Sequence, residues 1–312
     1  MAFPKLKNKL VLAPMAGVSN LPFRLLCQKY GCGLAYTAQL SATAIIKQNP
    51  KTMKLAQTSD EEKLVGLQLF GNNPPTLLKA ALKLEGNFDV IDLNFGCPSR
   101  KIVSRGYGSA LLKEKDRIRE IIKILSKGLE KPVTVKMRSG FKKVEALELV
   151  KIIESSGASA ITIHGRTKEQ GYSGNSDWDI IRQVKETVSI PVIGNGDVVD
   201  GKSAKELLEY SKCDYVMVAR AAMNNPMIFD SINYYFKHGK DKIIAKQAKM
   251  NLLLEYIELC EKHDFFNIPN LKFTALNFLK GFRGSKELRV NLMKCKDKGS
   301  IMQETKNFLS NN

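Results

Sequence analysis

The chain has 312 residues, of which 44% are hydrophobic and 26% charged, so it can bury a substantial core and is not an intrinsically disordered protein. Its 49 basic and 31 acidic residues give a net charge of +18, which favours a polyanionic partner, although a lysine-rich solvated surface produces the same excess. The six cysteines form no Cys-x-x-Cys pair and only three histidines accompany them, which argues against a zinc or iron–sulfur centre.

Neither a signal peptide nor a membrane-spanning segment is expected. The N-terminal stretch MAFPKLKNKLVLAPMAG lacks a continuous apolar core, and no run of about 18 apolar residues occurs along the chain. We therefore expect a protein of the cytoplasm, where cysteine thiols stay reduced.

Eight short apolar runs rich in valine, isoleucine and leucine recur along the chain, each followed by an amphipathic stretch. This alternation is typical of βα units that build a parallel sheet. The expected strands are Leu10 to Ala13, Leu34 to Thr37, Val65 to Leu69, Val90 to Leu93, Val133 to Lys136, Ala160 to Ile163, Val192 to Gly194 and Tyr215 to Val218. Eight such units predict an α/β protein with a (β/α)8 TIM barrel, which suits the strand count and chain length better than a doubly wound open sheet.

Helices connect these strands and continue after them. Apolar residues recur at i, i+3 and i+4 over 116–126, 144–155 and 202–209, which indicates amphipathic helices. After about residue 240 the strand pattern stops, and 243–309 reads as entirely helical. We therefore expect a catalytic barrel over 1–240 and a small all-helical domain over 241–312.

The expected helical domain carries a basic segment. Between Lys272 and Lys298 there are eight basic and two acidic residues, interleaved with Phe273, Phe278 and Phe282. The aromatic residues are better explained as core, whereas the basic residues are candidates for phosphate contacts in a nucleic acid.

Polar residues and glycines cluster at the C-terminal ends of the expected strands. In a barrel these ends meet at one mouth, where the reactive groups of the fold gather. A single buried Gln, Asn or His is more often a structural hydrogen-bonding residue, but convergence of several favours a functional site. The residues that converge are Gln68, Asn94, Cys97, Lys136, His164, Asn195 and Arg220.

Two features near the end of the barrel suit a phosphate group. The G-N-G-D segment at 194–197 and Arg220 can offer backbone N–H groups and a guanidinium, although ordinary turn chemistry explains the glycines equally well. No P-loop and no G-x-G-x-x-G after a strand occurs, so a mononucleotide such as FMN fits better than a dinucleotide.

Five segments together resemble the tRNA-dihydrouridine synthases. They are APMAGVSNLPFR, NFGCPSRKIVSRGYGSALL, VKMRSG, HGRTKEQGYSGNSDW and IGNGDV. The resemblance spans roughly residues 10 to 230 with the motifs in order, and continues more faintly into 271–289. It implies a flavin-binding barrel with a helical tRNA-binding domain, which reduces the C5=C6 bond of specific uridines in tRNA while NADPH or NADH reduces FMN.

The resemblance also assigns roles to individual residues. Cys97 is the acid that protonates C5 after hydride reaches C6, because a thiol that is protonated near neutral pH can donate that proton. Lys136 lies near the flavin N1 and C2 carbonyl, and Gln68 bonds the pyrimidine edge of the ring. The other expected flavin and phosphate contacts are Pro14, Met15, Ala16, His164, Asn195, Gly196, Asp197, Ala219 and Arg220. The expected contacts to the substrate base or ribose are Asn94 and Arg138.

Three positions depart from the family pattern. Ala219 stands where glycine is usual before Arg220, and Ala38 stands where an acidic residue is common. The histidine expected shortly after Lys272 is missing. The first departure concerns phosphate binding, and the other two concern tRNA contacts.

Two other functions remain open at this point. A flavin barrel that reduces a free pyrimidine or enone would use the same hydride and acid, but it would not need the basic helical tail. A non-catalytic RNA-binding protein would not need Cys97, Lys136 and His164 together.

Overall fold

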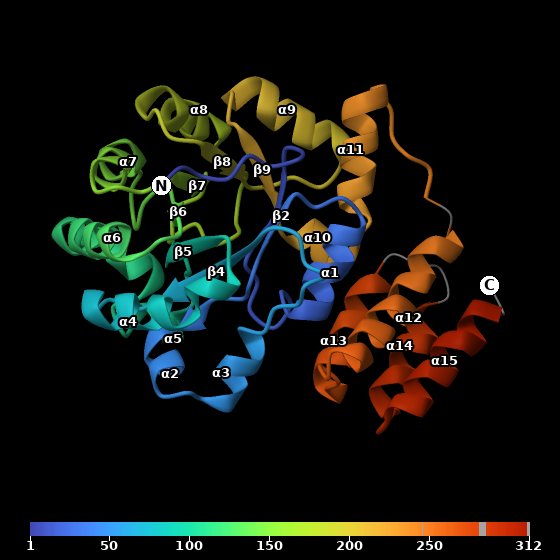
Figure 1. Cartoon of the computed structure of the whole chain (residues 1–312). Helices are drawn as coiled ribbons and strands as arrows, with labels where there is room; N and C mark the ends of the chain where they lie inside the picture. The colour runs from blue at the N-terminus through green and yellow to red at the C-terminus, as the bar shows by residue number, and fades with distance from the viewer. Residues whose placement is uncertain (245, 281–284, 311–312) are drawn as a thin grey trace.

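The computed structural model describes residues 1–244, 246–280 and 285–310. Its centre is a barrel of parallel strands, in the order β2-β1-β9-β8-β7-β6-β5-β4, which closes through pairing of β2 with β4. The strands are β1 (Leu10–Leu12), β2 (Leu34–Tyr36), β3 (Leu40–Ser41), β4 (Val65–Phe70), β5 (Val90–Phe95), β6 (Val133–Arg138), β7 (Ala160–His164), β8 (Val192–Asn195) and β9 (Tyr215–Val218). Figure 1 shows the helices arranged around this barrel.

The predicted TIM barrel is therefore confirmed, and each of the eight predicted strands is present. Several strands run one or two residues further than predicted, into polar residues at the barrel mouth: β6 reaches Arg138 and β7 reaches His164. The two-residue strand β3, which pairs with the end of β4, was not predicted because it carries no apolar run of its own.

Helices cover the outside of the barrel, and several begin at a side chain that caps their free N–H groups, as Asn20 does for α1 and Asp177 for α8. They are α1 (Leu21–Lys29), α2 (Ala42–Ile46), α3 (Pro50–Leu55), α4 (Pro74–Leu84), α5 (Arg100–Val103), α6 (Lys115–Gly128), α7 (Ala146–Ser155), α8 (Trp178–Thr187), α9 (Gly201–Ser211), α10 (Arg220–Asn224) and α11 (Ile228–His238). Short 3₁₀ turns lie at Glu85–Asn87 and Gly108–Lys113.

The interior of the barrel is divided between apolar and polar side chains. Val11, Leu34, Tyr36 and Met217 belong to one buried apolar cluster inside it. The ring of Tyr36 fits against Gly66 of β4, where an added Cβ would lie 2.3 Å from Tyr36 Cε1. This half of the barrel forms a packed floor beneath the mouth.

The other half of the interior is polar. The register of the strands places Gln68 beside Asp92, Asp92 beside Thr134, and Asn94 beside Lys136 on adjacent strands. Because side chains alternate along a strand, residues in such cross-strand rows lie on the same face of the sheet. Polar groups from β4, β5 and β6 therefore form a continuous layer under the mouth.

Four further helices follow the barrel: α12 (Lys246–Lys262), α13 (Ile268–Phe278), α14 (Ser285–Lys294) and α15 (Lys298–Ser310). They lie beside α1 and α10 (Figure 1). The helices predicted from residue 243 onward are thus present, and Phe278 is buried as core, whereas Phe273 is exposed. Phe282 lies outside the described residues.

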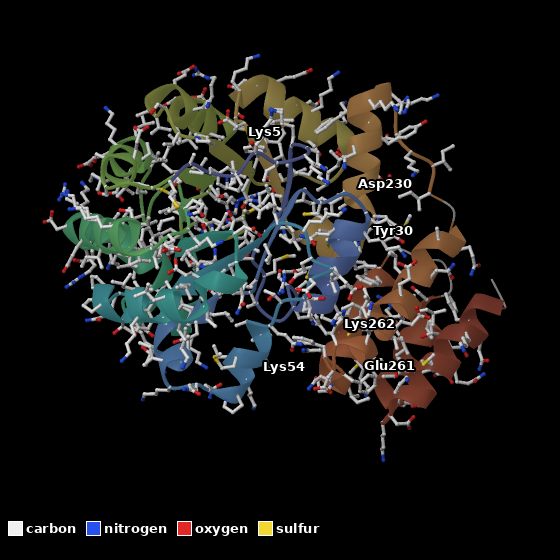
Figure 2. All side chains as sticks on the ribbon, in the orientation of Figure 1. Lys5, Tyr30, Lys54, Asp230, Glu261 and Lys262 are labelled. Atoms are coloured by element: carbon white, nitrogen blue, oxygen red, sulfur yellow. The ribbon has the colours of Figure 1, made fainter. Side chains whose placement is uncertain are left out.

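The C-terminal helices bind the barrel through specific contacts. Asn20, which caps α1 through Phe23 N at 3.0 Å, donates its side-chain N–H to the Tyr256 hydroxyl of α12 at 2.8 Å. The ring of Phe278 lies 6.4 Å from that of Phe23, centroid to centroid. Lys54 pairs with Asp264 at 3.0 Å, and Lys54 and Lys262 lie at this junction in Figure 2.

No helix among the described residues is both long enough and apolar enough to cross a lipid bilayer.

Candidate functional site

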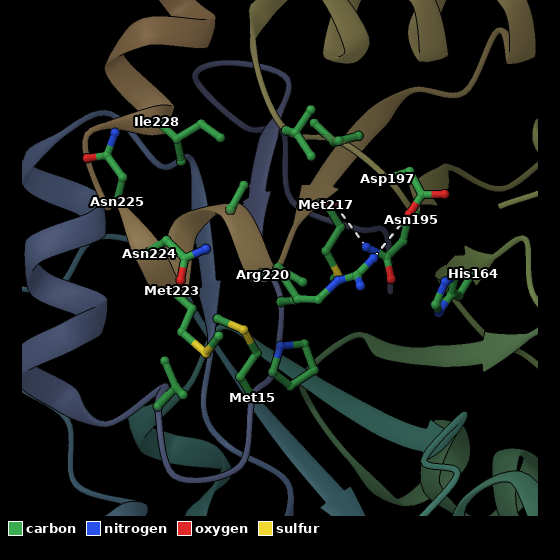
Figure 3. Close-up of a pocket in the computed structure, with 18 of the residues that line it drawn as sticks. Met15, His164, Asn195, Asp197, Met217, Arg220, Met223, Asn224, Asn225 and Ile228 are labelled. Carbon is green, nitrogen blue, oxygen red and sulfur yellow. Dashed lines mark hydrogen bonds and ion pairs between the residues drawn. The ribbon is translucent and has the colours of Figure 1, made fainter. Parts of the chain in front are cut away.

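A cavity of about 1140 Å³ opens at the C-terminal ends of the barrel strands (Figure 3). Its far wall reaches Phe273 and Lys280 of the C-terminal helical region. Of the residues predicted for the site, all but one line this cavity, namely Pro14, Met15, Ala16, Asn94, Cys97, Lys136, Arg138, His164, Asn195, Gly196, Asp197, Ala219 and Arg220. The strand-end residues therefore converge as predicted, and Gln68 is the exception.

Cys97 lies on the loop after β5 and is partly exposed to the cavity. Gln39 Nε2 donates a hydrogen bond to Cys97 Sγ at 3.4 Å. The Cys97 carbonyl accepts from Ser109 Oγ at 2.9 Å, and the Cys97 amide donates to Asn94 Oδ1 at 2.9 Å. Both the backbone and the sulfur of this residue are therefore fixed by neighbours.

The side chain of Asn94 is saturated with hydrogen bonds. Its Nδ2 donates to Gln39 Oε1 at 2.9 Å and to Gln68 Oε1 at 2.8 Å. Its Oδ1 accepts from the backbone amides of Gly96 and Cys97. An amide group has two donors and two acceptor lone pairs, so none is left over. Asn94 thus positions the Cys97 loop, and a direct bond to a substrate would require one of these four bonds to exchange.

Gln68 lies below the cavity and is fully buried. Its Nε2 donates to Asp92 Oδ2 at 2.7 Å, and Asp92 Oδ1 accepts from Thr134 Oγ1 at 2.7 Å. Burial raises the pKa of Asp92 to about 6, although these two hydrogen bonds oppose the rise. In this structure Gln68 therefore supports Asn94 from beneath rather than forming the cavity wall.

Lys136 reaches the cavity from β6. Its Nζ donates to Asn195 Oδ1 at 3.0 Å, and Asn195 in turn donates to the Met217 carbonyl at 2.9 Å. Burial and the nearby Arg138 lower the pKa of Lys136 to about 8. Within the described chain this ammonium makes one hydrogen bond, so two N–H donors remain for an anionic or carbonyl-bearing ligand.

Arg138 is buried, and its guanidinium binds backbone carbonyls. Nε donates to the Gly96 oxygen at 3.1 Å, while Nη1 donates to the oxygens of Thr167 and Gly171 at 2.8 Å each. Arg138 thus ties the Cys97 loop to the loop after β7. The exposed ring of Tyr172 lies over it, 5.5 Å from the guanidinium carbon.

Two arginines meet Asp197 at the edge of the cavity. Arg166 binds both carboxylate oxygens, at 2.9 and 2.7 Å, and exposed Arg220 binds one at 3.1 Å. Burial alone would raise the pKa of Asp197, but the bonds from Arg166 and Ser176 outweigh it and lower the pKa below its ordinary value. Arg220, shown reaching toward Asp197 in Figure 3, is therefore held at the cavity edge as a cation.

His164 is neutral in this environment. Burial, followed by the charges of Lys136, Arg138, Arg166 and Arg220, lowers its pKa to about 2. Four cations around one imidazole make this side of the cavity strongly positive, which suits a phosphate or an anionic ring.

Among the residues of the site that were not predicted from the sequence are Gln39, Tyr172 and Arg166. Gln39 lies two residues after the expected strand Leu34 to Thr37, and that position was the available signal, whereas Tyr172 lies within a loop. Arg166 is part of the H-G-R-T segment, where its place two residues after His164 was the available signal. Ala219 has a negative φ of −122°, so its backbone lies outside the left-handed region that favours glycine.

The donor set fits a flavin mononucleotide. Lys136 provides free N–H donors inside the barrel, and Arg220 provides a cation at the edge. Asn224 Oδ1, buried and without a partner among the described residues, can accept a hydrogen bond from a ligand hydroxyl. The cavity volume of about 1140 Å³ lies slightly above the roughly 300–1,000 Å³ of common ligand pockets, so it is large enough for a mononucleotide.

Comparison with solved structures supports the fold. Histamine dehydrogenase from Rhizobium sp. 4-9 aligns with a TM-score of 0.57 at 14% identity, over 81% of this chain and 49% of that one. An amine oxidase from Pseudomonas geniculata, HisD, aligns with a TM-score of 0.58 at 12% identity, over 80% and 50%. At such low sequence identity, the structural similarity supports a shared barrel fold and says nothing about function.

Comparison with curated protein sequences is more specific. A probable tRNA-dihydrouridine synthase of Rickettsia conorii is 40% identical over 298 residues, 93% of this chain and 90% of that protein. The tRNA-dihydrouridine synthase B of Pasteurella multocida is 35% identical over 270 residues, 85% and 80% of the two chains. Residues 11–312 match the sequence model named "Dihydrouridine synthase (Dus)". The chain therefore belongs to the dihydrouridine synthase family.

Proposed function

We propose that this protein is an FMN-dependent tRNA-dihydrouridine synthase that reduces the C5=C6 bond of specific uridines in tRNA. The observation that carries the proposal is the placement of a thiol, Cys97, and a cation with free donors, Lys136, on one cavity of a family barrel. A proton donor and a hydride-donating ring must meet the same base for this reduction.

Bound FMN, reduced by NADPH or NADH, supplies the hydride that the uracil C6 receives. Lys136 would bind the edge of the ring that becomes negatively charged on reduction, where a cation is stabilising. Arg220 and the Gly196–Asp197 backbone would bind the phosphate, for which Arg220 must exchange Asp197 as its partner. Pro14, Met15, Ala16, His164, Asn195 and Ala219 line the remaining space for the cofactor. Gln68 supports this set from below.

Cys97 provides the proton. Addition of hydride at C6 breaks the C5=C6 π bond and leaves an enolate, and the Cys97 thiol gives its proton to C5. The S–H bond breaks, a C–H bond forms, and the sulfur is left as a thiolate. Gln39 holds the sulfur, and Asn94 and Arg138 hold its loop, so the thiol meets the base in a fixed orientation.

The tRNA partner is supported by the net charge of +18 and by the names of the relatives. We propose that residues 1–240 form the catalytic barrel and 241–312 the helical tRNA-binding domain, with both facing the cavity mouth where Phe273 and Lys280 lie. The target base must leave its stack to reach the cavity, at a cost of a few kcal/mol that phosphate contacts offset. The enzyme would act in the cytoplasm.

The test is a gene deletion with dihydrouridine mapped in tRNA at single-nucleotide resolution. Loss at a defined position, restored by the wild-type gene but not by Cys97→Ala, supports the proposal. The purified Cys97→Ala protein should keep its flavin and its reduction by NADPH while uridine reduction falls about 10²- to 10⁴-fold. Unchanged dihydrouridine in the deletion strain, or turnover of free uracil in place of tRNA, would contradict it.

A further inference from the structure

A second pocket of about 770 Å³ adjoins the first cavity at the barrel mouth. Ala16 and Gln39 line both spaces, so they share a wall. The second pocket is built from α2 and the segment after it, from Phe70 at the end of β4, and from α5 and the residues around it. It lies next to the proposed acid, because Gln39 is the residue that bonds Cys97 Sγ. None of the predicted cofactor contacts except Ala16 reaches it.

This pocket, termed here the flanking pocket, has an unbalanced positive charge. Lys47, Lys101 and Arg105 line it, all three are exposed, and no Asp or Glu is among its lining residues. Within the described part of the chain none of the three forms an ion pair. Many surface cations elsewhere do, as Arg117 does with Glu120. Unpaired cations around one hollow concentrate positive potential and attract an anionic ligand.

Aromatic surface accompanies these cations. The half-buried rings of Phe70 and Tyr107 line the same pocket, with centroids 5.9 Å apart at an angle of 56°. A positive groove with aromatic rings is the combination that binds single-stranded nucleic acid, since phosphates pair with the cations while a base stacks on a ring.

We infer that the flanking pocket binds the nucleotide directly next to the target uridine, with Lys47, Lys101 and Arg105 at its phosphate and Phe70 or Tyr107 against its base. The inference rests on the proposed function, because a uridine inside the first cavity remains covalently joined to its neighbours. Enzymes that act on an extruded base commonly contact the flanking nucleotides as well. The shared wall at Gln39 gives a neighbour a place within reach of the first cavity.

The test compares two triple variants of the FMN-loaded protein that remove the same charge. The pocket variant is Lys47→Gln, Lys101→Gln and Arg105→Gln. The control is Lys123→Gln, Lys127→Gln and Lys151→Gln, on exposed positions of α6 and α7 away from the mouth. The substrate is tRNA isolated from a strain that lacks dihydrouridine.

For the pocket variant we expect kcat/KM for tRNA to fall about tenfold or more, chiefly through KM, with the control within about twofold of wild type. Flavin reduction by NADPH without tRNA should stay within about twofold in both variants. The slope of log Kd against log salt should decrease by about 0.7 in the pocket variant alone, because the three side chains together neutralise one phosphate and each neutralised single-stranded phosphate contributes about 0.7.

Equal effects in the two triple variants would overturn the inference, since only general charge would matter. A slower NADPH reaction with unchanged KM for tRNA would overturn it in favour of a dinucleotide phosphate. If the wild-type protein reduces no tRNA uridine, the proposed function fails, and the salt slopes still decide whether the pocket binds RNA. A circular dichroism melt of each variant confirms that it is folded.

Discussion

Gln39 Nε2 donates to Cys97 Sγ across 3.4 Å while Gln39 Oε1 accepts from Asn94 at 2.9 Å. The amide is thereby fixed with its N–H group toward the sulfur. A hydrogen bond to sulfur strengthens as negative charge develops there, so Gln39 would stabilise the thiolate that the proposed proton transfer leaves. Gln39 is in this sense a positioning residue for the proposed acid.

Replacing Gln39 should slow thiol chemistry without preventing cofactor reduction. In Gln39→Leu we expect kcat for tRNA to fall roughly tenfold, since one hydrogen bond to a charged group is lost, with KM and the NADPH reaction unchanged. Alkylation of Cys97 by iodoacetamide should slow in Gln39→Leu and slow further in Gln39→Glu. The other five cysteines are buried, so labelling reports on Cys97. Equal alkylation rates in all three proteins would contradict the role of Gln39.

Lys136 should govern the reduction of bound flavin. Its pKa of about 8 leaves the side chain mostly charged at neutral pH, where it can stabilise an anionic ring. Lys136→Gln should slow reduction by NADPH about 10- to 100-fold in stopped-flow measurements, and Lys136→Arg should recover part of the loss. The wild-type rate should decline only above about pH 8, because a bound anion raises this pKa further. If the rate of flavin reduction in Lys136→Gln declined by the same amount above about pH 8, the decline would belong to the titration of another group.

The pH dependence of stability should reveal His164. Its folded pKa of about 2 lies below the unfolded value of 6.5, so between these values the unfolded chain binds more protons. Stability is therefore lost as pH falls below 6.5, by ~2 kcal/mol at pH 5 from this residue. His164→Asn should show a smaller loss between pH 7 and 5 in urea unfolding.

The titration of Asp92 has the opposite effect on stability over part of this pH range. Its pKa is raised from 3.8 to about 6, so protonation of Asp92 favours the folded state between these values. The comparison of His164→Asn with wild type removes this contribution, because Asp92 is present in both. Parallel curves for the two proteins would exclude His164 as the cause.

The contact of Gly66 with Tyr36 should be sensitive to a single methyl group. Gly66→Ala places a Cβ 2.3 Å from Tyr36 Cε1 inside a packed barrel, which should lower the free energy of unfolding by ~1–3 kcal/mol. Gly86→Ala is the control, since an added Cβ there meets no atom within 4 Å. Adding Tyr36→Leu to Gly66→Ala should recover stability, and a double variant less stable than both single variants would oppose the explanation.

Much of the barrel and its mouth could be predicted from the sequence, because both depend on local patterns. An apolar run such as Val133 to Lys136 indicates a buried strand by its residue types, and parallel strands bring their C-terminal ends together. That rule was sufficient to group Cys97, Lys136, His164 and Arg220 around one cavity.

The hydrogen-bond partners of each polar side chain could not be predicted in the same way. Asn94 and Gln68 have the residue types of ligand contacts, yet their amide groups bond to each other and to Gln39 or Asp92. Sequence position does not show which hydrogen bonds the folded protein itself takes up. Arg138 is a similar case, because its guanidinium binds loop carbonyls that are distant in sequence.

One side chain, Asn20, both begins α1 and bonds Tyr256, 236 residues later in the chain. This has a consequence for protein engineering by exchange of parts between relatives. A foreign C-terminal segment grafted onto this barrel must bring a hydroxyl to the position of Tyr256, or leave a buried amide hydrogen unpaired. Grafts that keep this pair, together with the aromatic contact between Phe23 and Phe278, should give chimaeras that stay folded while their RNA surfaces differ.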